Sequence, residues 1–356
     1  MAYTTINKST DYFNAQTWAG NDGSDRAMTT SFQPDWVWIK ATDGTQDHQI
    51  YDAVRGATKD IHSNNDDAEG TTTNGLKSFT SDGFTLGGDA GVNDTSLDYV
   101  GWSWKAGNSS GSSNTNGTLT STVSASTTSG FSIGTYTSDI SSSGSKTVGH
   151  GLGTTPKVIF TKNLNQGGQR WGVQVPGILS DNYILELNSS STPSDMSGNG
   201  SLTTVNSNVF SVNYADGVGN ATGSGNYIFY AFADITGFSK FGSYTGNGTT
   251  DGTFVYTGFK PAFVIVKNTS ATANWVMTDN QISFNGKGTN DSSVLFPSVN
   301  NATSDAYGLQ LHSNGFKFAG SDSSSATVNG SGNVYIYMAF AEAPLVGSNN
   351  VPATAR

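Results

Sequence analysis

One phrase occurs three times in this chain, and it constrains the fold more than any other feature. In each copy a proline precedes an apolar run, and a lysine stands six positions after the proline. The copies are SFQPDWVWIKA from Ser31, TTPKVIFTKN from Thr154 and GFKPAFVIVKN from Gly258. The prolines, Pro34, Pro156 and Pro261, are 122 and 105 residues apart. This spacing is too long for a solenoid repeat and suits a small domain.

Each copy lies in a longer frame whose landmarks keep the same order. An aromatic residue precedes the phrase, and an aromatic strand closes the frame. The opening residues are Trp18, Tyr136 and Tyr244, and the closing strands begin at Tyr99, Tyr227 and Tyr335. We therefore expect three homologous domains in which the prolines and the closing tyrosines occupy equivalent positions.

Composition favours β structure throughout the chain. The 44 glycines and the many Ser, Thr and Asn residues disfavour helices, whereas 11% aromatic residues supply packed cores. The sequence predicts an all-β protein with three tandem homologous antiparallel β-sandwich, jelly-roll-like domains over 1–107, 129–236 and 237–345. Residues 108–128 are predicted to be a Ser/Thr/Asn-rich linker, and 346–356 an extended tail.

The repeated phrase predicts a central strand in each domain. Its run is apolar at nearly every position, which is typical of a strand covered on both faces. The lysine is expected to mark the exit of the strand into solvent, with its stem over apolar surface. The tryptophans of the first domain's two aromatic strands are predicted to be core residues: Trp36, Trp38, Trp102 and Trp104.

Charge and composition argue against several classes of partner and cofactor. Only 12% of residues are charged and the net charge is -10, so we expect no nucleic-acid partner. No apolar run reaches the roughly 18 residues of a membrane span, so no membrane insertion is expected. There are no cysteines. The acidic segment with Asp60, His62, Asp66, Asp67 and Glu69 lacks a metal-loop pattern, so no metal or other cofactor is predicted.

Catalytic motifs are also weak, and we expect a protein that is not an enzyme. GNSSG at Gly107 resembles a nucleophile elbow, but a polar stretch follows it where the elbow requires a helix. The four histidines are scattered, and no pair of carboxylates has the spacing of a glycosidase site.

Two loops are the candidate ligand-binding sites, because each combines an indole with amides as carbohydrate recognition requires. They follow the phrase lysine in the second and third domains. The candidate residues are Asn163, Asn165, Gln169, Arg170, Trp171, Asn268, Asn274 and Trp275. The alternative is that both indoles fold inward as core residues.

Several segments together resemble a known family. FQPDWVWIK, YDAVRG, SDGFTLGGD, YVGWSWKAG, GHGLGTTPKVIFTKN and YIYMAFAEAP look like the concanavalin-like (lectin- or SPRY-like) repeat proteins of tailed marine bacteriophages. The resemblance covers nearly the whole chain, although the second domain has QRWGVQVPG where the first has HQIYDAVRG. Such proteins are usually described as tail-fibre or virion structural proteins, and no agreed binding residues carry over.

The resemblance implies a structural virion protein, made in the bacterial cytoplasm and assembled as an external appendage or on the capsid surface. The first hypothesis is a tail-fibre, receptor-binding component that contacts a host surface glycan or envelope receptor and other virion proteins. The second is a capsid decoration or head-fibre protein, and the third a glycan-degrading enzyme. A homo-oligomer, specifically a trimer, is expected because parallel chains increase avidity.

Overall fold

The computed structural model describes residues 4–344, apart from 22, 24, 216, 220–224, 283–292 and 320–324, and these residues form an all-β structure. Helical structure among them is limited to two 3-10 turns, η1 (Ser9–Asp11) and η2 (Ser197–Asn199). None of the described helices is long and apolar enough to cross a membrane. The tail at 346–356 lies outside the described residues.

The three frames form antiparallel sheets with one strand order. The opening strand pairs with the closing strand, then come the phrase strand and a fourth strand. The first repeat has β1 (Phe13–Ala19), β7 (Asp98–Trp104), β3 (Trp36–Ala41) and β4 (Gln49–Asp52). The second has β10 (Phe131–Thr137), β17 (Asn226–Phe232), β12 (Val158–Asn163) and β13 (Gly172–Gln174). The third has β18 (Ser239–Thr245), β24 (Val334–Pro344), β20 (Phe259–Asn268) and β21 (Val276–Asp279).

The register of these strands confirms the equivalence of the landmarks. The opening aromatic lies opposite the closing tyrosine in every repeat: Trp18 opposite Tyr99, Tyr136 opposite Tyr227 and Tyr244 opposite Tyr335. Two residues after each proline, Trp36, Val158 and Phe263 lie opposite Trp104, Phe232 and Phe340.

Each repeat also has a smaller antiparallel sheet. These sheets are β2 (Arg26–Thr29), β6 (Gly83–Leu86) and β5 (Leu76–Thr80); β11 (Ser145–Gly149) and β16 (Val209–Asn213); and β19 (Val255–Tyr256), β23 (Gly315–Phe318) and β22 (Leu309–His312). Apolar side chains of the larger and smaller sheet form one buried cluster within each repeat. One face of every larger sheet is therefore covered from within its own repeat.

The predicted linker at 108–128 contains regular structure. It contains β8 (Ser112–Asn114) and β9 (Ser121–Ser126), which extend the second repeat's large sheet beyond β10. At its other edge this sheet continues through β14 (Tyr183–Glu186) and β15 (Ser194–Asp195). The polar composition led to the wrong prediction, because strands at this end of the sheet need few buried apolar side chains. Val123 alone supplies a buried apolar side chain within β9.

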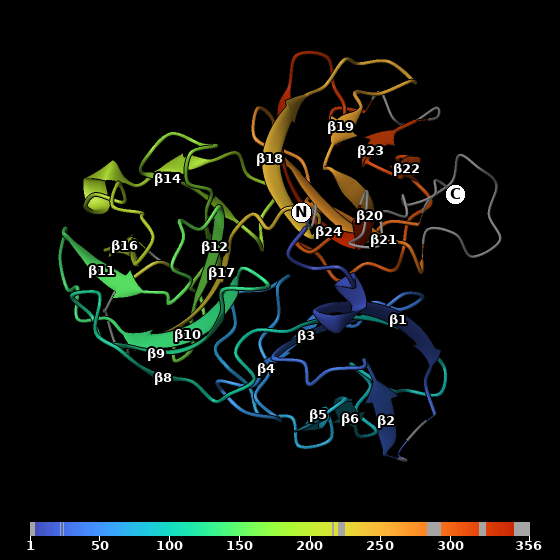
Figure 1. Ribbon diagram of the computed structural model, residues 1–356, viewed down its shortest axis with the longest axis horizontal. Helices are drawn as coiled ribbons and strands as arrows, with labels where there is room; N and C mark the ends of the chain where they lie inside the picture. Colours follow the sequence, from blue (N-terminus) through green and yellow to red (C-terminus); the bar gives the residue numbers. More distant parts are fainter. Residues whose placement is uncertain are drawn as a thin grey trace.

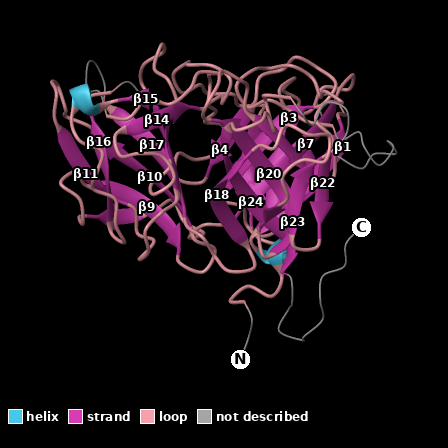
Figure 2. Ribbon diagram, turned by 90° about the horizontal axis from the view of Figure 1, so that it is seen from above, coloured by secondary structure: helices cyan, strands magenta, loops and turns pink. Residues whose placement is uncertain are grey.

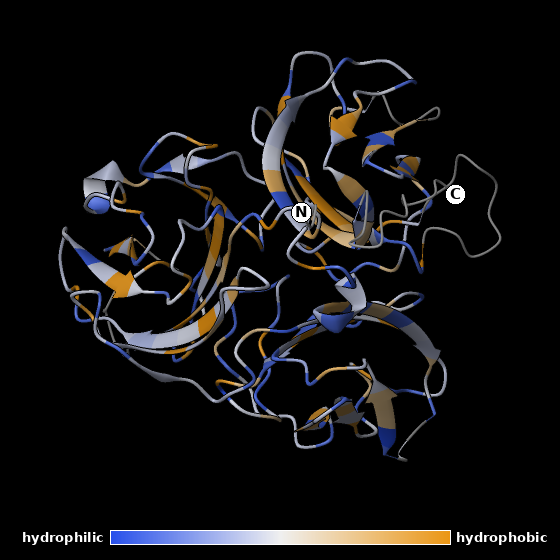
Figure 3. Ribbon diagram, in the orientation of Figure 1, coloured by the Kyte–Doolittle hydropathy of each residue, from blue (hydrophilic) through white to orange (hydrophobic). Residues whose placement is uncertain are grey.

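The other faces of the three large sheets meet in a shared central core. Figure 1 shows the three groups of strands around a common centre, and Figure 3 shows apolar residues on the strands that face it. Aromatic pairs join every two repeats: Trp36 to Tyr230 at 4.9 Å, Trp104 to Phe263 at 5.5 Å and Phe232 to Phe340 at 5.8 Å between ring centroids. All four predicted core tryptophans lie in this cluster, so the phrase strand is apolar on both faces because each face has a different partner.

Candidate functional site

The indoles of the two predicted ligand loops are buried. Trp171 and Trp275, the residues immediately before β13 and β21, have 0% and 1% of their surface exposed. Each indole Nε1–H donates to a carbonyl of another repeat: Trp171 to His62 at 2.7 Å and Trp275 to Glu186 at 2.8 Å. The predicted exposed stacking surface is therefore absent at both positions, because each indole finds both apolar cover and a hydrogen-bond acceptor between repeats.

The polar residues of these loops shape the turns. Asn163 Oδ1 accepts from the amides of Asn165 and Gln166, and Asn268 Oδ1 accepts from those of Ser270 and Ala271. Asn165 Oδ1 in turn accepts from the Asn226 amide at 3.1 Å.

The remaining candidates also have partners within the chain. Arg170 pairs with Glu186, and Asn274 bonds to Ser298. Gln169 contributes its backbone carbonyl to the Lys162 amine, whereas its buried side-chain Oε1 has no hydrogen-bond partner among the described residues. The structure thus brings the predicted residues together as loop anchors.

Equivalent residues of the three repeats close a ring of hydrogen bonds. The position of Trp171 and Trp275, just before the fourth strand, is occupied in the first repeat by His48. His48 Nδ1 accepts from Trp38 Nε1–H at 2.9 Å, so its Nε2 carries the proton and donates to the Phe296 carbonyl at 3.1 Å. Burial lowers the pKa of His48 to about 3, and the ring stays neutral. The first repeat thus donates to the third, the third to the second and the second to the first.

The phrase lysines are buried, contrary to the predicted exit into solvent. Lys40, Lys162 and Lys267 have no exposed surface. Lys162 Nζ donates to the Asp66 carbonyl of the first repeat at 3.0 Å, and Lys267 Nζ to the Ser190 carbonyl of the second at 3.0 Å. Burial lowers the pKa of each amine to about 8. Because each lysine ends an apolar run, we expected its amine to lie in water. Backbone carbonyls accept the hydrogen bonds of these amines instead.

Two buried carboxylates complete the contacts between repeats. Tyr230 donates to Asp52 at 2.7 Å, and Arg55 Nε donates to the same Oδ2 at 2.5 Å. At the equivalent position of the third repeat, Asp279 accepts from Trp102 Nε1 at 2.8 Å. No cation pairs with Asp279 among the described residues, and burial raises its pKa to about 6.

The equivalent contact between the second and third repeats contains no polar side chain. Val175 occupies the position of the aspartates, and Met338 that of the tyrosine and tryptophan donors. Both side chains are 3% exposed. The carboxylate and its donor are therefore either both present or both replaced by apolar residues.

Side chains of the acidic segment of the first repeat also form ion pairs and hydrogen bonds with nearby residues. Asp60 contacts His62 and Thr72, and Glu69 pairs with Arg55 and Lys59. Within the described ranges, no three His, Cys, Asp or Glu side chains are grouped to hold a metal ion.

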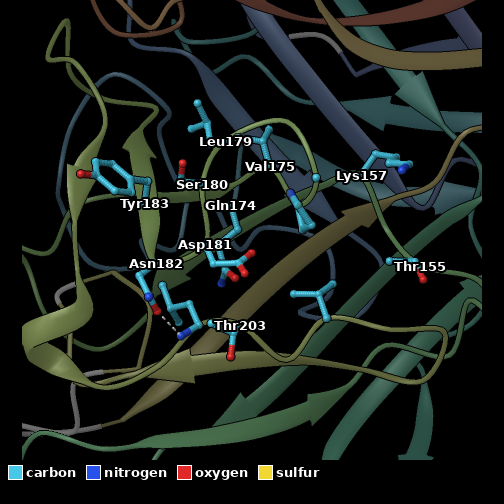
Figure 4. A pocket seen from close by; sticks show the side chains of 14 residues that line it. Thr155, Lys157, Gln174, Val175, Leu179, Ser180, Asp181, Asn182, Tyr183 and Thr203 are labelled. Atoms are coloured by element: carbon cyan, nitrogen blue, oxygen red, sulfur yellow. Dashed lines mark hydrogen bonds between the residues drawn. The ribbon is translucent and has the colours of Figure 1, made fainter.

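An open polar groove in the second repeat is the strongest candidate for a binding site (Figure 4). It has a volume of about 190 Å³ and is lined on opposite sides by Lys157 with Thr155 and by Ser180 to Tyr183. A second hollow of about 350 Å³ shares Leu179, Ser180 and Tyr183 and continues to Thr269 and Ser270 of the third repeat. We call the two together the 157–183 groove.

The groove carries side chains that are available to a ligand. Tyr183 is 39% exposed. Asp181 and Lys157 form no ion pair with any described residue. Asn182 holds the loop in shape: its φ is 69°, and its Oδ1 accepts from the Leu202 amide at 2.7 Å. An aromatic face and a carboxylate thus stand on a fixed loop, and an amine lies on the opposite side of the groove.

Sequence reasoning missed this groove because it looked for tryptophan. The available signal was SDNY at Ser180, where turn-forming residues precede a tyrosine at the start of a strand. Long loops gather at one side of the molecule in Figure 2.

Comparison with known proteins gives a family without an assigned activity. The chain belongs to the family described as Domain of unknown function (DUF7483), whose model matches residues 8–344. No curated protein and no solved structure matches the chain. One family model therefore spans all three sheets, as expected if they form a single structural unit.

Proposed function

We propose that this DUF7483 protein is a non-enzymatic structural component of a tailed-phage virion, acting as a receptor-binding appendage. The observation that carries the proposal is the 157–183 groove, where Tyr183 and Asp181 are exposed beside Asn182, which fixes their loop, and the half-buried Lys157 lies across from them. Such a groove suits a host surface glycan, because a sugar ring packs on an aromatic face while its hydroxyls bond to charged groups. The resemblance to phage repeat proteins supports the virion location.

The architecture supports a role that requires rigidity. We propose that each repeat is an antiparallel β-sandwich and that the three sandwiches act as one body. The central core and the inter-repeat bonds of His48, Trp171 and Trp275 favour this reading. Binding loops on a rigid scaffold lose little entropy when they capture a ligand.

The homotrimer stays a prediction. Three sheet faces already pack together within one chain, so a trimer would have to use other surfaces. Sedimentation of the purified chain tests this, and a monomer at micromolar concentration would contradict it.

Immunogold labelling of virions tests the location, and adsorption tests the groove. We expect label on the tail, and purified protein that competes with phage for host cells. Label confined to the head would favour a capsid decoration protein instead. Competition should fall at least tenfold for the Tyr183→Ala/Asp181→Ala variant. It should be unchanged for Lys77→Ala, which removes an exposed ion pair with Asp25. Equal competition by both variants would refute the groove as the receptor site.

A further inference from the structure

Two large aromatic side chains are exposed side by side on the smaller sheet of the third repeat. Phe254 and Tyr256 are 45% and 60% exposed, whereas Val255 between them is 5% exposed and packs inward. Alternate residues of a strand point to the same face and lie roughly 7 Å apart. We call the two rings and their neighbour His312 the β19 strip.

The other two repeats show that the fold does not need these rings. Val255 pairs with Phe316, and the equivalent pairs are Met28 with Phe84 and Val148 with Phe210. The positions of Phe254 and Tyr256 are therefore occupied by Ala27 and Thr29 in the first repeat, and by Thr147 and Gly149 in the second. The equivalent sheets of the first and second repeats therefore form with small or polar residues at these positions. The exposed aromatics of the third repeat require another explanation.

Shielding of a neighbouring glycine does not explain why the two aromatic side chains are there. The Phe254 ring lies over Gly315, where an added Cβ would stand 2.8 Å from Cζ of the ring. However, at the equivalent Gly83 the three atoms nearest to an added Cβ all belong to the backbone of Met28 and Thr29, and the position of Phe254 is occupied by Ala27. Both glycines are required by the backbone, because their Cβ atoms would stand 2.1 Å and 1.8 Å from carbonyl oxygens of the adjacent strand.

The surroundings of the strip are polar and have little unbalanced charge. The Phe254 and His312 rings meet edge to face at 5.7 Å. His312 Nε2 is buried from solvent and has no hydrogen-bond partner in the described part of the chain. On the same face, Lys317 forms an ion pair with Asp251.

The exposed area is too small for a stable protein interface. Side chains of this size present roughly 150–250 Å² each, so the exposed parts amount to about 200 Å². A stable protein partner covers roughly 800 Å² on each side. Strand β19 pairs over only two residues, Val255 and Tyr256, so it is a poor template for adding a strand from another chain.

We infer that the β19 strip is a stacking platform for a neutral saccharide. Sugar C–H faces pack on the rings of Phe254 and Tyr256, and hydroxyls remain in water or bond to nearby polar groups. Neutral rather than acidic sugars are specified, because the local ion pair is balanced and the chain carries a net charge of -10. This inference is independent of the 157–183 groove and of the virion location.

Saturation-transfer difference NMR on the full chain tests the inference. The probes are hexasaccharides of maltose, cellulose, laminarin and chitin type, with an alginate hexamer as the acidic comparison. We expect saturation transfer to at least one neutral probe and none to alginate. The variant Phe254→Ala/Tyr256→Thr carries the residues of the first repeat at these two positions. It should raise the dissociation constant of the saccharide at least tenfold. An unchanged urea midpoint checks that the variant folds.

Val334→Ala is the matched control, since Val334 is another exposed apolar side chain, 40% exposed, outside the strip. It should bind the saccharide as the natural chain does. Equal binding by the double variant, or no neutral probe bound by the natural chain, would overturn the inference. Sedimentation showing a dimer that only the double variant loses would also overturn it, in favour of a second copy as the occupant.

Discussion

Asp279 should contribute less to the stability of this protein at neutral pH than at mildly acidic pH. Its carboxylate is fully buried between the first and third repeats and accepts hydrogen bonds from Trp102, Gln281 and Ile282. Desolvation outweighs these bonds and raises the pKa from its ordinary value of 3.8 to about 6. Between these two values the folded chain holds a proton that the unfolded chain has lost. The free energy of unfolding therefore falls as pH rises through this window.

The magnitude follows from the size of the rise. One pH unit of pKa difference corresponds to about 1.4 kcal/mol, and at pH 4 the unfolded carboxyl is already more than half ionised, so Asp279 lowers the free energy of unfolding by about 2 kcal/mol between pH 4 and pH 7. Asp35 contributes a slope of the same sign, since burial raises its pKa to about 6. Carboxyls with lowered pKa, such as Asp60, act in the opposite direction. The contribution of Asp279 must therefore be isolated by substitution.

The comparison is between the natural chain and Asp279→Asn, which cannot ionise. Urea unfolding is followed by tryptophan fluorescence at four pH values from 4 to 7. We expect the substitution to be more destabilising at pH 4 than at pH 7 by about 2 kcal/mol. Equal destabilisation at all four values would refute the argument, because it would mean that Asp279 titrates alike in the folded and unfolded chain.

Two further substitutions test the contacts between repeats. Lys267→Met should lower the free energy of unfolding by about 1–3 kcal/mol, because the Ser190, Asn268 and Ala273 carbonyls lose their donor; Lys240→Met, at an exposed ion pair, should change urea stability by less than about 1 kcal/mol. Val175→Asp should destabilise by about 3–5 kcal/mol, since the equivalent donor position is Met338 and the new carboxylate is left without a partner. Urea curves of unchanged midpoint for Lys267→Met or Val175→Asp would contradict the respective assignment.

The strands and their equivalence between repeats could be predicted from the sequence because their signals are local. An apolar run after a proline and an aromatic closing strand depend on neighbours within a few residues, and they recur in three copies. Trp18 with Tyr99 and Tyr244 with Tyr335 therefore occupy equivalent places in their repeats, and the structure adds that the two members of each pair lie opposite each other. The burial of Trp36 and Trp104 follows from the same pattern.

The candidate site could not be predicted in the same way. A loop that combines an indole with amides has the same local sequence whether the indole contacts a sugar or a carbonyl of another repeat. Trp171 meets the carbonyl of His62, which lies 109 positions earlier in the chain. Tyr183 has weaker local features, yet it lines the groove because the chain on both sides leaves it exposed.

The sequence by itself determined the all-β class, the threefold repetition and the equivalence of strands, because apolar runs, prolines and turn residues act over short distances. Only the tertiary structure decided what covers the second face of each large sheet. The pattern of Trp36 and Trp38 requires apolar cover but does not name its source, and here that source is two other repeats. The same packing determined that Lys162 and Lys267 end on carbonyls instead of in water. Contacts between segments about a hundred residues apart depend on how three sheets close around one core, which no local pattern encodes.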